Sequence, residues 1–172
     1  MCEKYFFWGV NLFANVIEEL LKHACPTIKY RINKEILNRQ ETFEIYQPKI
    51  LEDKRVQYTL SWQNTDGYFG EVFHGGWIPK EERKYSTTGA ESALRFLSEM
   101  GFPKENQNVC KGLSVLLDSN WNRGASCWNM YYPEIGLFGD DLIRAVVFSY
   151  FKIEEHEFIQ KEIQKAFDCM ER

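Results

Sequence analysis

The segment WQNTDGYFGE, residues 62–71, carries the most specific pattern in this 172-residue chain. Its glycine–aromatic part recurs as IGLFGD at residues 135–140, so both copies read Gly-x-Phe-Gly-acid. The first glycine permits a turn, and the second lets a helix N-terminus approach closely, where an acidic side chain suits the positive end of the helix. The phenylalanine can plug between helix pairs, and Gln63 can hydrogen-bond the exposed end of a neighbouring helix. The segment therefore predicts a loop that joins stacked helical hairpins.

Hydrophobic spacing on both sides of this segment is helical. Short gaps join three pairs of the expected helices, which favours antiparallel hairpins. Thr88 and Glu91 have capping-box spacing, and Gly101 stands where a C-terminal cap needs a positive φ. No segment predicts a convincing strand, and two long loops are expected at Gly67–Lys84 and Ser119–Gly136. The expected helices are Asn11–Ala24, Thr27–Leu37, Ile50–Trp62, Ala90–Met100, Asn108–Leu117, Asp140–Phe151 and Glu154–Met170.

Composition limits the classes of function. The chain has 21 basic and 25 acidic residues, a net charge of -4, so it lacks the basic excess that a nucleic-acid surface needs. No apolar run approaches the roughly 18 residues of a membrane span. The absence of a secretory pattern predicts a cytoplasmic protein. Five scattered cysteines without a C-x-x-C pair predict reduced, mostly buried thiols. We expect one all-α helical-repeat domain over residues 1–172.

The segment Trp62–Gly70 resembles the Gln-x(2–5)-Gly-x-Trp repeat of squalene and terpenoid cyclases. It also resembles the Asp-Gly-Gly-Phe-Gly repeat of the protein prenyltransferase β subunit. The segment Pro26–Arg31, followed by Glu35–Leu37, is similar to a Pro-Ser-Ile-Arg-Tyr…Leu stretch found upstream of such repeats in uncharacterised bacterial relatives. The resemblance implies an α/α toroid built from helical hairpins.

The chain departs from these families in ways that bear on activity. Phe69 stands where the cyclase repeat has tryptophan, and the Asp-x-Asp-Asp acid motif of squalene-type cyclases is missing. No segment matches the zinc-binding residues of the prenyltransferases. Because the expected hairpins are too few for a full ring, the resemblance implies a partial ring, a fragment, or a half that dimerises.

The candidate catalytic residues are His74 and Asp66. His74 lies in a glycine-rich loop and could act as a general acid or base near neutral pH, or bond loop carbonyls structurally. Asp66 could stabilise a cation or simply shape a turn. Aromatic side chains in and beside the two loops could line a substrate pocket or pack between repeats. These candidate substrate-binding residues are Trp62, Tyr68, Phe69, Trp77, Trp128 and Tyr132.

Two further groups have a chemical and a structural interpretation. Cys127 with His74 could form a zinc site or a nucleophile–base pair, although their spacing does not require them to meet. Asp140 and Asp141 could bind a metal or protonate a substrate, but capping and the helix dipole explain two acidic residues at a helix start. We assign no metal site and no cofactor.

Three functions follow as hypotheses. The first is a prenyltransferase-like or terpenoid-cyclase-like domain with an aromatic pocket for an apolar or isoprenoid small molecule, and without an assigned reaction. The second is a non-catalytic helical scaffold for protein–protein or self-association, because an incomplete ring leaves apolar hairpin faces exposed. The third is a carbohydrate-binding or carbohydrate-active toroid, which rests on fold analogy alone.

Overall fold

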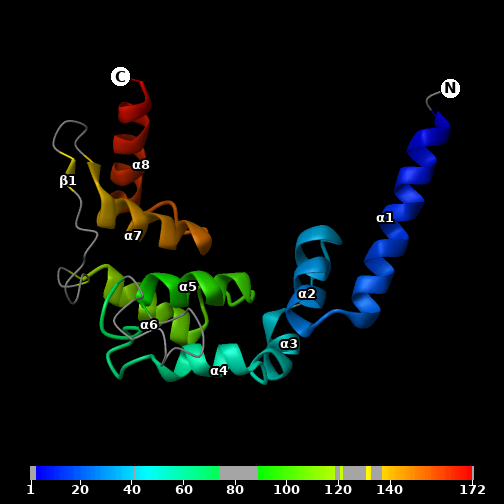
Figure 1. The fold of residues 1–172 in the computed structure, drawn as a ribbon, viewed down its shortest axis with the longest axis horizontal. Coiled ribbons are helices and arrows are strands. Elements are labelled where there is room, and N and C mark those ends of the chain that lie inside the picture. Colours follow the sequence, from blue (N-terminus) through cyan, green and yellow to red (C-terminus); the bar gives the residue numbers. More distant parts are fainter. Residues whose placement is uncertain are drawn as a thin grey trace, which may run out of the picture. The chain divides into compact units, whose positions relative to one another are not determined.

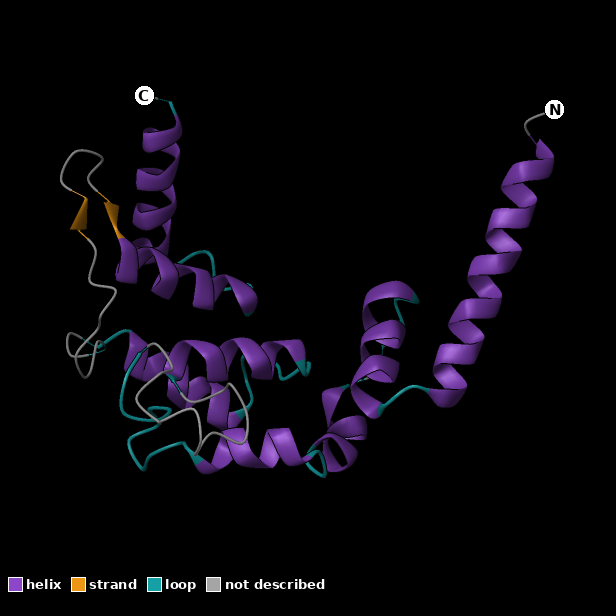
Figure 2. Ribbon diagram, in the orientation of Figure 1, coloured by secondary structure: helices purple, strands orange, loops and turns teal. Residues whose placement is uncertain are grey.

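The chain forms two compact units, Met1–Asp53 and Lys54–Arg172, in a computed structural model (Figures 1 and 2). Nearly all regular structure in the described residues is helical, so the all-α class is confirmed. None of the described helices has the length and apolar character that crossing a membrane requires. The structure describes residues 3–40, 42–73, 89–118, 121, 131–132 and 137–171, with side chains described within 13–40, 42–73, 89–118, 121, 141–168 and 170–171.

The first unit contains the helices α1 (Glu3–His23), α2 (Pro26–Arg31) and α3 (Phe43–Ile50), with the π-helix η1 (Ile32–Ile36) directly after α2. Pro26 occupies the start of α2, where a missing N–H costs nothing because that donor has no intrahelical partner. Helix α2 contacts both α1 and α3. It is therefore the central element of this unit.

The core of the first unit is aromatic and aliphatic. Tyr30 on α2 packs its ring against Phe43, with 5.6 Å between ring centroids and an edge-to-face angle of 70°. Ile32 and Ile50 are buried in the same unit. The buried polar side chains of this unit are Thr27 and Asn33, and Asn33 donates through Nδ2 to the Tyr46 hydroxyl at 2.8 Å. That hydrogen bond satisfies the amide where the helix changes to π geometry.

The second unit begins with α4 and continues with four longer helices and one very short strand pair. Helix α5 contacts α6 and α7, and α7 contacts α8. Figure 1 shows α8 leaving α7 at a steep angle. The elements are α4 (Lys54–Ser61), α5 (Ala90–Glu99), α6 (Gln107–Leu116), β1 (Tyr131–Tyr132), β2 (Leu137–Phe138), α7 (Gly139–Tyr150) and α8 (Glu157–Met170).

The ends of α5 explain its bounds. Its N-cap is Gly89, whose backbone N–H donates to the Ser92 hydroxyl at 3.2 Å, so the expected box of Thr88 and Glu91 is displaced by one residue. The prediction for Gly101 is confirmed, because its φ is +88° and the next N–H, of Phe102, returns to the Leu97 carbonyl at 3.0 Å. Thr88 itself lies outside the described residues.

The expectations for two helices differ from the structure. Helix α1 begins at Glu3 rather than Asn11. Helix α3 is absent from the expected helices, yet it continues through Pro48, and the Leu51 N–H reaches the Gln47 carbonyl at 2.9 Å. The proline removes one internal hydrogen bond, because its own nitrogen carries no hydrogen, and the hydrogen bond that follows it still forms.

The expectation of no convincing strand holds apart from one very short strand pair in the described residues. Two-residue strands pair antiparallel, with Tyr131 opposite Phe138 and Tyr132 opposite Leu137. The first of them lies inside the expected second loop, Ser119–Gly136. The second runs straight into α7 at Gly139, so the second Gly-x-Phe-Gly copy ends as a strand-to-helix junction.

Candidate functional site

The segment 62–70 is a compact loop held by its own backbone. The Gly70 N–H donates to the Trp62 carbonyl at 2.8 Å, and the Asn64 N–H donates to the Tyr68 carbonyl at 2.7 Å. The Asn64 side chain closes the same ring through Nδ2 to the Gly70 carbonyl at 2.9 Å. Gly67 takes a φ of +99°, a left-handed conformation that glycine adopts without steric cost. The predicted turn is therefore confirmed.

This loop docks onto helix α6. The Gln63 side chain donates through Nε2 to the Asn108 carbonyl at 2.7 Å and to the Gly67 carbonyl at 2.9 Å. Asn108 lies in the first turn of α6, so the prediction that Gln63 bonds the end of a neighbouring helix is confirmed. Gly67 lies so close to α6 that a Cβ there would be 2.8 Å from the Lys111 Cβ and 3.0 Å from its carbonyl oxygen.

Phe69 fills a space between α5 and α6. A Cβ built on Gly112 of α6 would lie 2.9 Å from the Phe69 ring and 3.2 Å from Cδ2 of Leu94 on α5. The glycine therefore leaves room for the ring, which is only 1% exposed. The prediction that this phenylalanine plugs between helices is confirmed for the first copy of the motif.

The other candidate residues of this loop have structural partners. Asp66 is exposed, and its Oδ1 accepts the Tyr68 N–H at 3.0 Å, as a turn-shaping aspartate does. Tyr68, like Phe69, is 1% exposed, so both rings belong to the core of the second unit. Trp62 is partly exposed, and its ring packs edge-to-face on Tyr58 at 5.7 Å. These four residues therefore lie close together in the loop, where they contribute to its structure.

Several candidates lie where the structure gives no geometry for their side chains. His74, Trp77, Cys127 and Trp128 lie outside the described residues. Tyr132 belongs to β1, and its side chain is outside the described set, as is that of Asp140 in the first turn of α7. The catalytic and substrate-binding assignments of these residues stay predictions. Asp141, in contrast, forms an ion pair with Arg144 at 3.0 Å.

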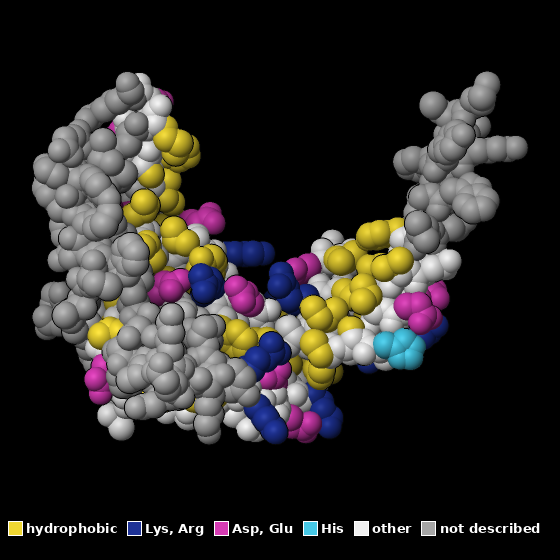
Figure 3. All heavy atoms as spheres, viewed as in Figure 1, with side chains coloured by type: hydrophobic (Ala, Val, Ile, Leu, Met, Phe, Trp, Pro, Cys, Tyr) yellow, Lys and Arg dark blue, Asp and Glu magenta, His cyan; other side chains and the backbone are white. Residues whose placement is uncertain are grey.

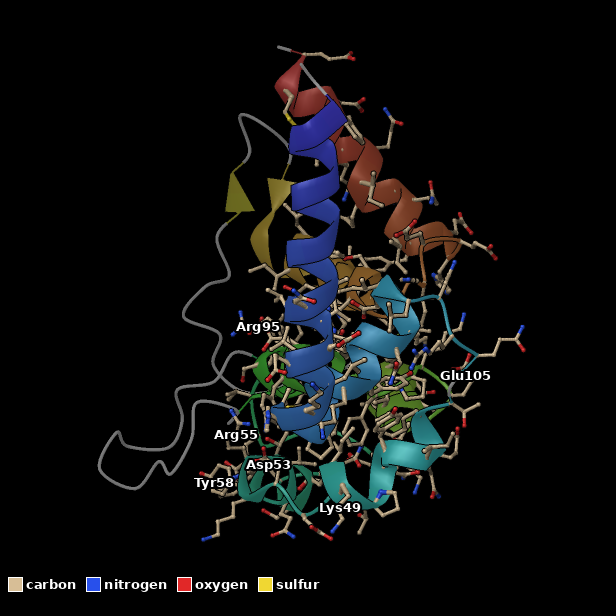
Figure 4. All side chains as sticks on the ribbon, turned by 90° about the vertical axis from the view of Figure 1, so that its right-hand side faces the viewer. Lys49, Asp53, Arg55, Tyr58, Arg95 and Glu105 are labelled. Atoms are coloured by element: carbon tan, nitrogen blue, oxygen red, sulfur yellow. The ribbon has the colours of Figure 1, made fainter. Side chains whose placement is uncertain are left out.

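Tyr58, beside Trp62, belongs to an edge of the second unit that also carries two arginines. Figure 4 shows Tyr58 and Arg55 of α4 on the same side of the view as Arg95 of α5. The Arg55 guanidinium lies 5.8 Å from the Phe96 ring centroid, which links α4 to α5. Arg95 pairs with Glu91 one turn earlier at 3.5 Å. These cations have neighbours of their own in the fold.

Within the described part of the chain, no group of three or more His, Cys, Asp or Glu side chains is placed to hold a metal ion. Cys25 and Cys110 are free thiols, as expected, but both are exposed, so the expectation of burial is wrong for these two. Cys25 precedes α2 and Cys110 lies on the outer face of α6. The other three thiols are outside the described side chains.

Sequence reasoning missed a mostly buried arginine on α7, with 11% of its side chain exposed. The Arg144 guanidinium lies between two aromatic rings, 4.4 Å from the Trp121 centroid and 3.7 Å from the Phe158 centroid. It donates to the Leu116 carbonyl at the end of α6 at 3.2 Å. Burial lowers the pKa of this guanidinium, and the nearby carboxylates of Asp141 and Glu162 oppose that shift.

The buried carboxylate of Glu162 on α8 accompanies this arginine. The side chain pairs with Lys165 through Oε1, while Oε2 has no hydrogen-bond partner among the described residues. Together the stacked arginine and the buried glutamate connect the end of α6 with α7 and α8. Nη1 of the arginine donates to a carbonyl and Nη2 pairs with a carboxylate, whereas its buried Nε has no hydrogen-bond partner among the described residues. Because these contacts join separate helices, we interpret the cluster as a structural joint.

Apolar side chains also reach the surface in helical rows. On α1, Phe13, Val16 and Leu20 are 60%, 48% and 39% exposed. On α8, Phe167 and Met170 are 56% and 75% exposed, and Figure 3 shows hydrophobic side chains gathered along that helix. Spacings of three and four residues place each row on one helix face. Sequence periodicity identified the apolar positions but not that these faces are uncovered.

Comparisons with protein-family models, curated proteins and solved structures found no significant match.

Proposed function

We propose that this chain is a non-catalytic helical scaffold that self-associates through exposed apolar helix faces. Its helix pairs would form a segment of a partial α/α toroid, and a second copy would cover the faces that the segment leaves open. The proposal selects the second of the three hypotheses that the sequence allows. It accommodates the departures from the cyclase and prenyltransferase patterns, since a scaffold needs neither their acid motif nor their zinc-binding residues.

The exposed rows on α1 and α8 carry this proposal. Large apolar side chains scattered singly on a surface are ordinary, but rows on one helix face are typical of interaction surfaces. Helix α8 presents Phe167 and Met170, which are 56% and 75% exposed, and this favours a surface that another protein covers.

The state of the aromatic loop supports the same conclusion. A pocket for an isoprenoid chain would need rings that face a cavity. Tyr68 and Phe69 are buried by the packing of the second unit, and Asp66 supports the turn that presents them. These three candidates therefore contribute to folding and to the position of α6.

Native mass spectrometry of the purified full chain tests this proposal against the pocket hypothesis. The protein would be measured alone, with zinc, and with a prenyl diphosphate. We expect a dimer or larger assembly whose subunit number does not depend on either ligand. A monomer would overturn the scaffold proposal, and a monomer that retains zinc or the isoprenoid would favour the pocket. A matched sample with a neutral oligosaccharide tests the carbohydrate alternative.

A further inference from the structure

Helix α8 begins with a histidine whose ring caps its first turn. His156 is the N-cap residue, and its Nδ1 accepts the Phe158 N–H at 3.3 Å. The His156 carbonyl accepts the Gln160 N–H at 3.1 Å, as the carbonyl of an N-cap residue does. The first N–H groups of a helix have no partner inside the helix. The ring therefore supplies a hydrogen bond that α8 itself cannot provide.

Protonation of the ring would remove this cap. A neutral imidazole has one nitrogen that accepts a hydrogen bond, whereas both nitrogens of the charged ring are donors. Nδ1 of His156 can therefore accept the Phe158 N–H only in the neutral ring. The charged ring would also place a cation at the positive end of the helix, where negative charge is stabilising. Histidine changes its charge between about pH 5 and about pH 8, so both effects belong to that range.

The charged groups near His156 do not replace the cap. Its neighbours in the sequence include three glutamates, which favour the charged ring but are equally near it in the unfolded chain, so much of their effect on stability cancels. On α7, which packs against α8, Arg144 and Asp141 pair with each other at 3.0 Å, so their opposite effects on the ring partly cancel. The other charged groups at this end of the unit are Asp118, Lys152, Glu154, Glu155, Glu157, Glu162 and Lys165.

Phe158 connects the cap to the joint between α6, α7 and α8. The centroid of its ring lies 3.7 Å from the Arg144 guanidinium, and the centroid of the Trp121 ring lies 4.4 Å from the same group. Arg144 in turn donates to the Leu116 carbonyl at the end of α6. Ile159, the residue after Phe158, is completely buried, so the first turn of α8 belongs to the packed part of the unit. Loss of the cap would therefore act on a ring that holds this joint.

We propose that His156 is a pH-sensitive cap that controls how firmly α8 is held on α7. The neutral ring caps α8 and keeps Phe158 over Arg144. As the pH falls through the range in which histidine is protonated, the cap is lost and the first turn of α8 loosens. The stabilisation is thus present at the alkaline end of that range and lost at the acidic end. All of these contacts lie within the second unit of one copy, so the inference does not depend on the proposed self-association.

Hydrogen exchange of the full chain at about pH 8 and about pH 5 tests this proposal. Protection factors of the α8 amides correct for the intrinsic effect of pH on exchange. His156→Asn is the matched variant, because an asparagine side chain caps a helix and carries no titratable group. We expect the protection factors to fall about tenfold more in the unchanged chain than in His156→Asn, which corresponds to about 1.4 kcal/mol. An equal fall in the two proteins would overturn the proposal.

Two further variants identify the group that is responsible. His156→Ala removes the cap at every pH, so at about pH 8 its α8 amides should be clearly less protected than those of the unchanged chain. Full protection in that variant would show that the ring does not cap the helix and would overturn the proposal. His23→Asn replaces an exposed histidine of α1 that pairs with Glu19 at 3.5 Å, and it should leave the pH response of α8 unchanged. Loss of the response in His23→Asn would also overturn the proposal.

The Arg144 side chain reports whether the cap acts on the joint. The rings of Phe158 and Trp121 shift the NMR resonances of the Arg144 Hδ protons, because both rings lie close to the guanidinium. We expect these resonances to move with pH in the unchanged chain and to stay in place in His156→Asn. If they stay in place in both proteins, protonation does not alter how α8 is held on α7, and the proposal is overturned.

Discussion

Replacing Gly112 with alanine tests how Phe69 fits between α5 and α6. In a helix interior this change normally stabilises by about 1 kcal/mol, because glycine has more conformational freedom to lose. Here the new Cβ would lie 2.9 Å from a buried ring. Overpacking of this kind costs about 1–3 kcal/mol. We therefore expect Gly112→Ala to lower the free energy of unfolding by up to about 2 kcal/mol, the difference between the two effects.

A double-mutant cycle isolates the contact. Phe69→Ala alone should cost about 3–5 kcal/mol, because it empties a fully buried site. In that background the Cβ of alanine at position 112 enters vacated space, so Gly112→Ala should stabilise by about 1 kcal/mol. The sign of the glycine substitution is thus expected to reverse between the two backgrounds. Such a reversal measures the coupling between the ring and the helix.

Urea denaturation followed by far-ultraviolet circular dichroism measures all four proteins. Ser114→Ala, at an exposed position of the same helix, is a reference for added helix propensity, less the hydrogen bond that the Ser114 hydroxyl donates to the Cys110 carbonyl at 2.8 Å. If Gly112→Ala stabilised the parent chain as much as it stabilises the Phe69→Ala background, the ring would not occupy the space over this glycine. The account of the loop as a plug would then be wrong.

Three further predictions concern other contacts. Gln63→Leu should destabilise the chain by about 1–3 kcal/mol, because it removes the side-chain hydrogen bonds to the Gly67 and Asn108 carbonyls. Amide hydrogen exchange should become faster first in the loop and at the start of α6. A uniform increase over the whole chain would show that Gln63 does not hold the loop on α6. Arg144→Lys should cost about 1–3 kcal/mol in urea denaturation, since an ammonium cannot stack between two rings and hold the same hydrogen bonds; an unchanged midpoint would show that the stacking is unimportant. The pKa of Glu44 is lowered first by its own backbone N–H and then by the Thr42 hydroxyl, so the charged carboxylate stabilises the folded chain above the unfolded-state pKa, and this stabilisation is lost as pH falls through the lower folded-state pKa. A side-chain NMR titration should give Glu44 a pKa below that of an ordinary glutamate, and Thr42→Val should raise it. An unchanged pKa in Thr42→Val would show that the hydroxyl does not contribute.

Sequence reasoning predicted the elements whose signals are local. Helical spacing located most helices, and Gly101 marked the end of α5 because a left-handed cap needs a glycine. The functions of Gln63 and Phe69 in the loop were also predictable, since an amide donor and a large ring beside a turn suit docking between helices. These inferences need only neighbours in sequence and one adjacent helix.

The remaining features depend on contacts between distant segments. Helix α3 was missed because Pro48 is a general helix breaker, yet the helix continues for two residues beyond it. Arg144 lies in an otherwise apolar stretch of α7, and Glu162 lies between Ile159 and Ile163 of α8. A charged residue among apolar neighbours was the available signal that these side chains are buried. The stacking of the arginine could not be predicted, because its two aromatic rings come from separate parts of the chain.

The exposed apolar rows on α1 and α8 show a different limit of prediction from sequence. Periodicity identifies which side of a helix avoids water, but it does not identify the surface that covers that side. Phe13 and Ile17 have the same sequence signal, yet Phe13 is 60% exposed and Ile17 is 7% exposed. The difference arises from what packs against α1. A self-associating protein therefore leaves part of its pattern unexplained within a single copy.

The docking of the loop onto α6 has a consequence for how such chains can diverge. Gln63 bonds backbone carbonyls, and Gly67 lies against the helix at the level of Lys111. Side chains on the outer face of α6 can consequently change while the loop stays docked on the helix, provided that a glycine stays at position 112. Distant relatives would share a sparse signature, Gln-x3-Gly-x-Phe followed by a helical glycine, with little overall identity. A search for that spaced pattern would test whether chains that differ elsewhere keep the same docked loop.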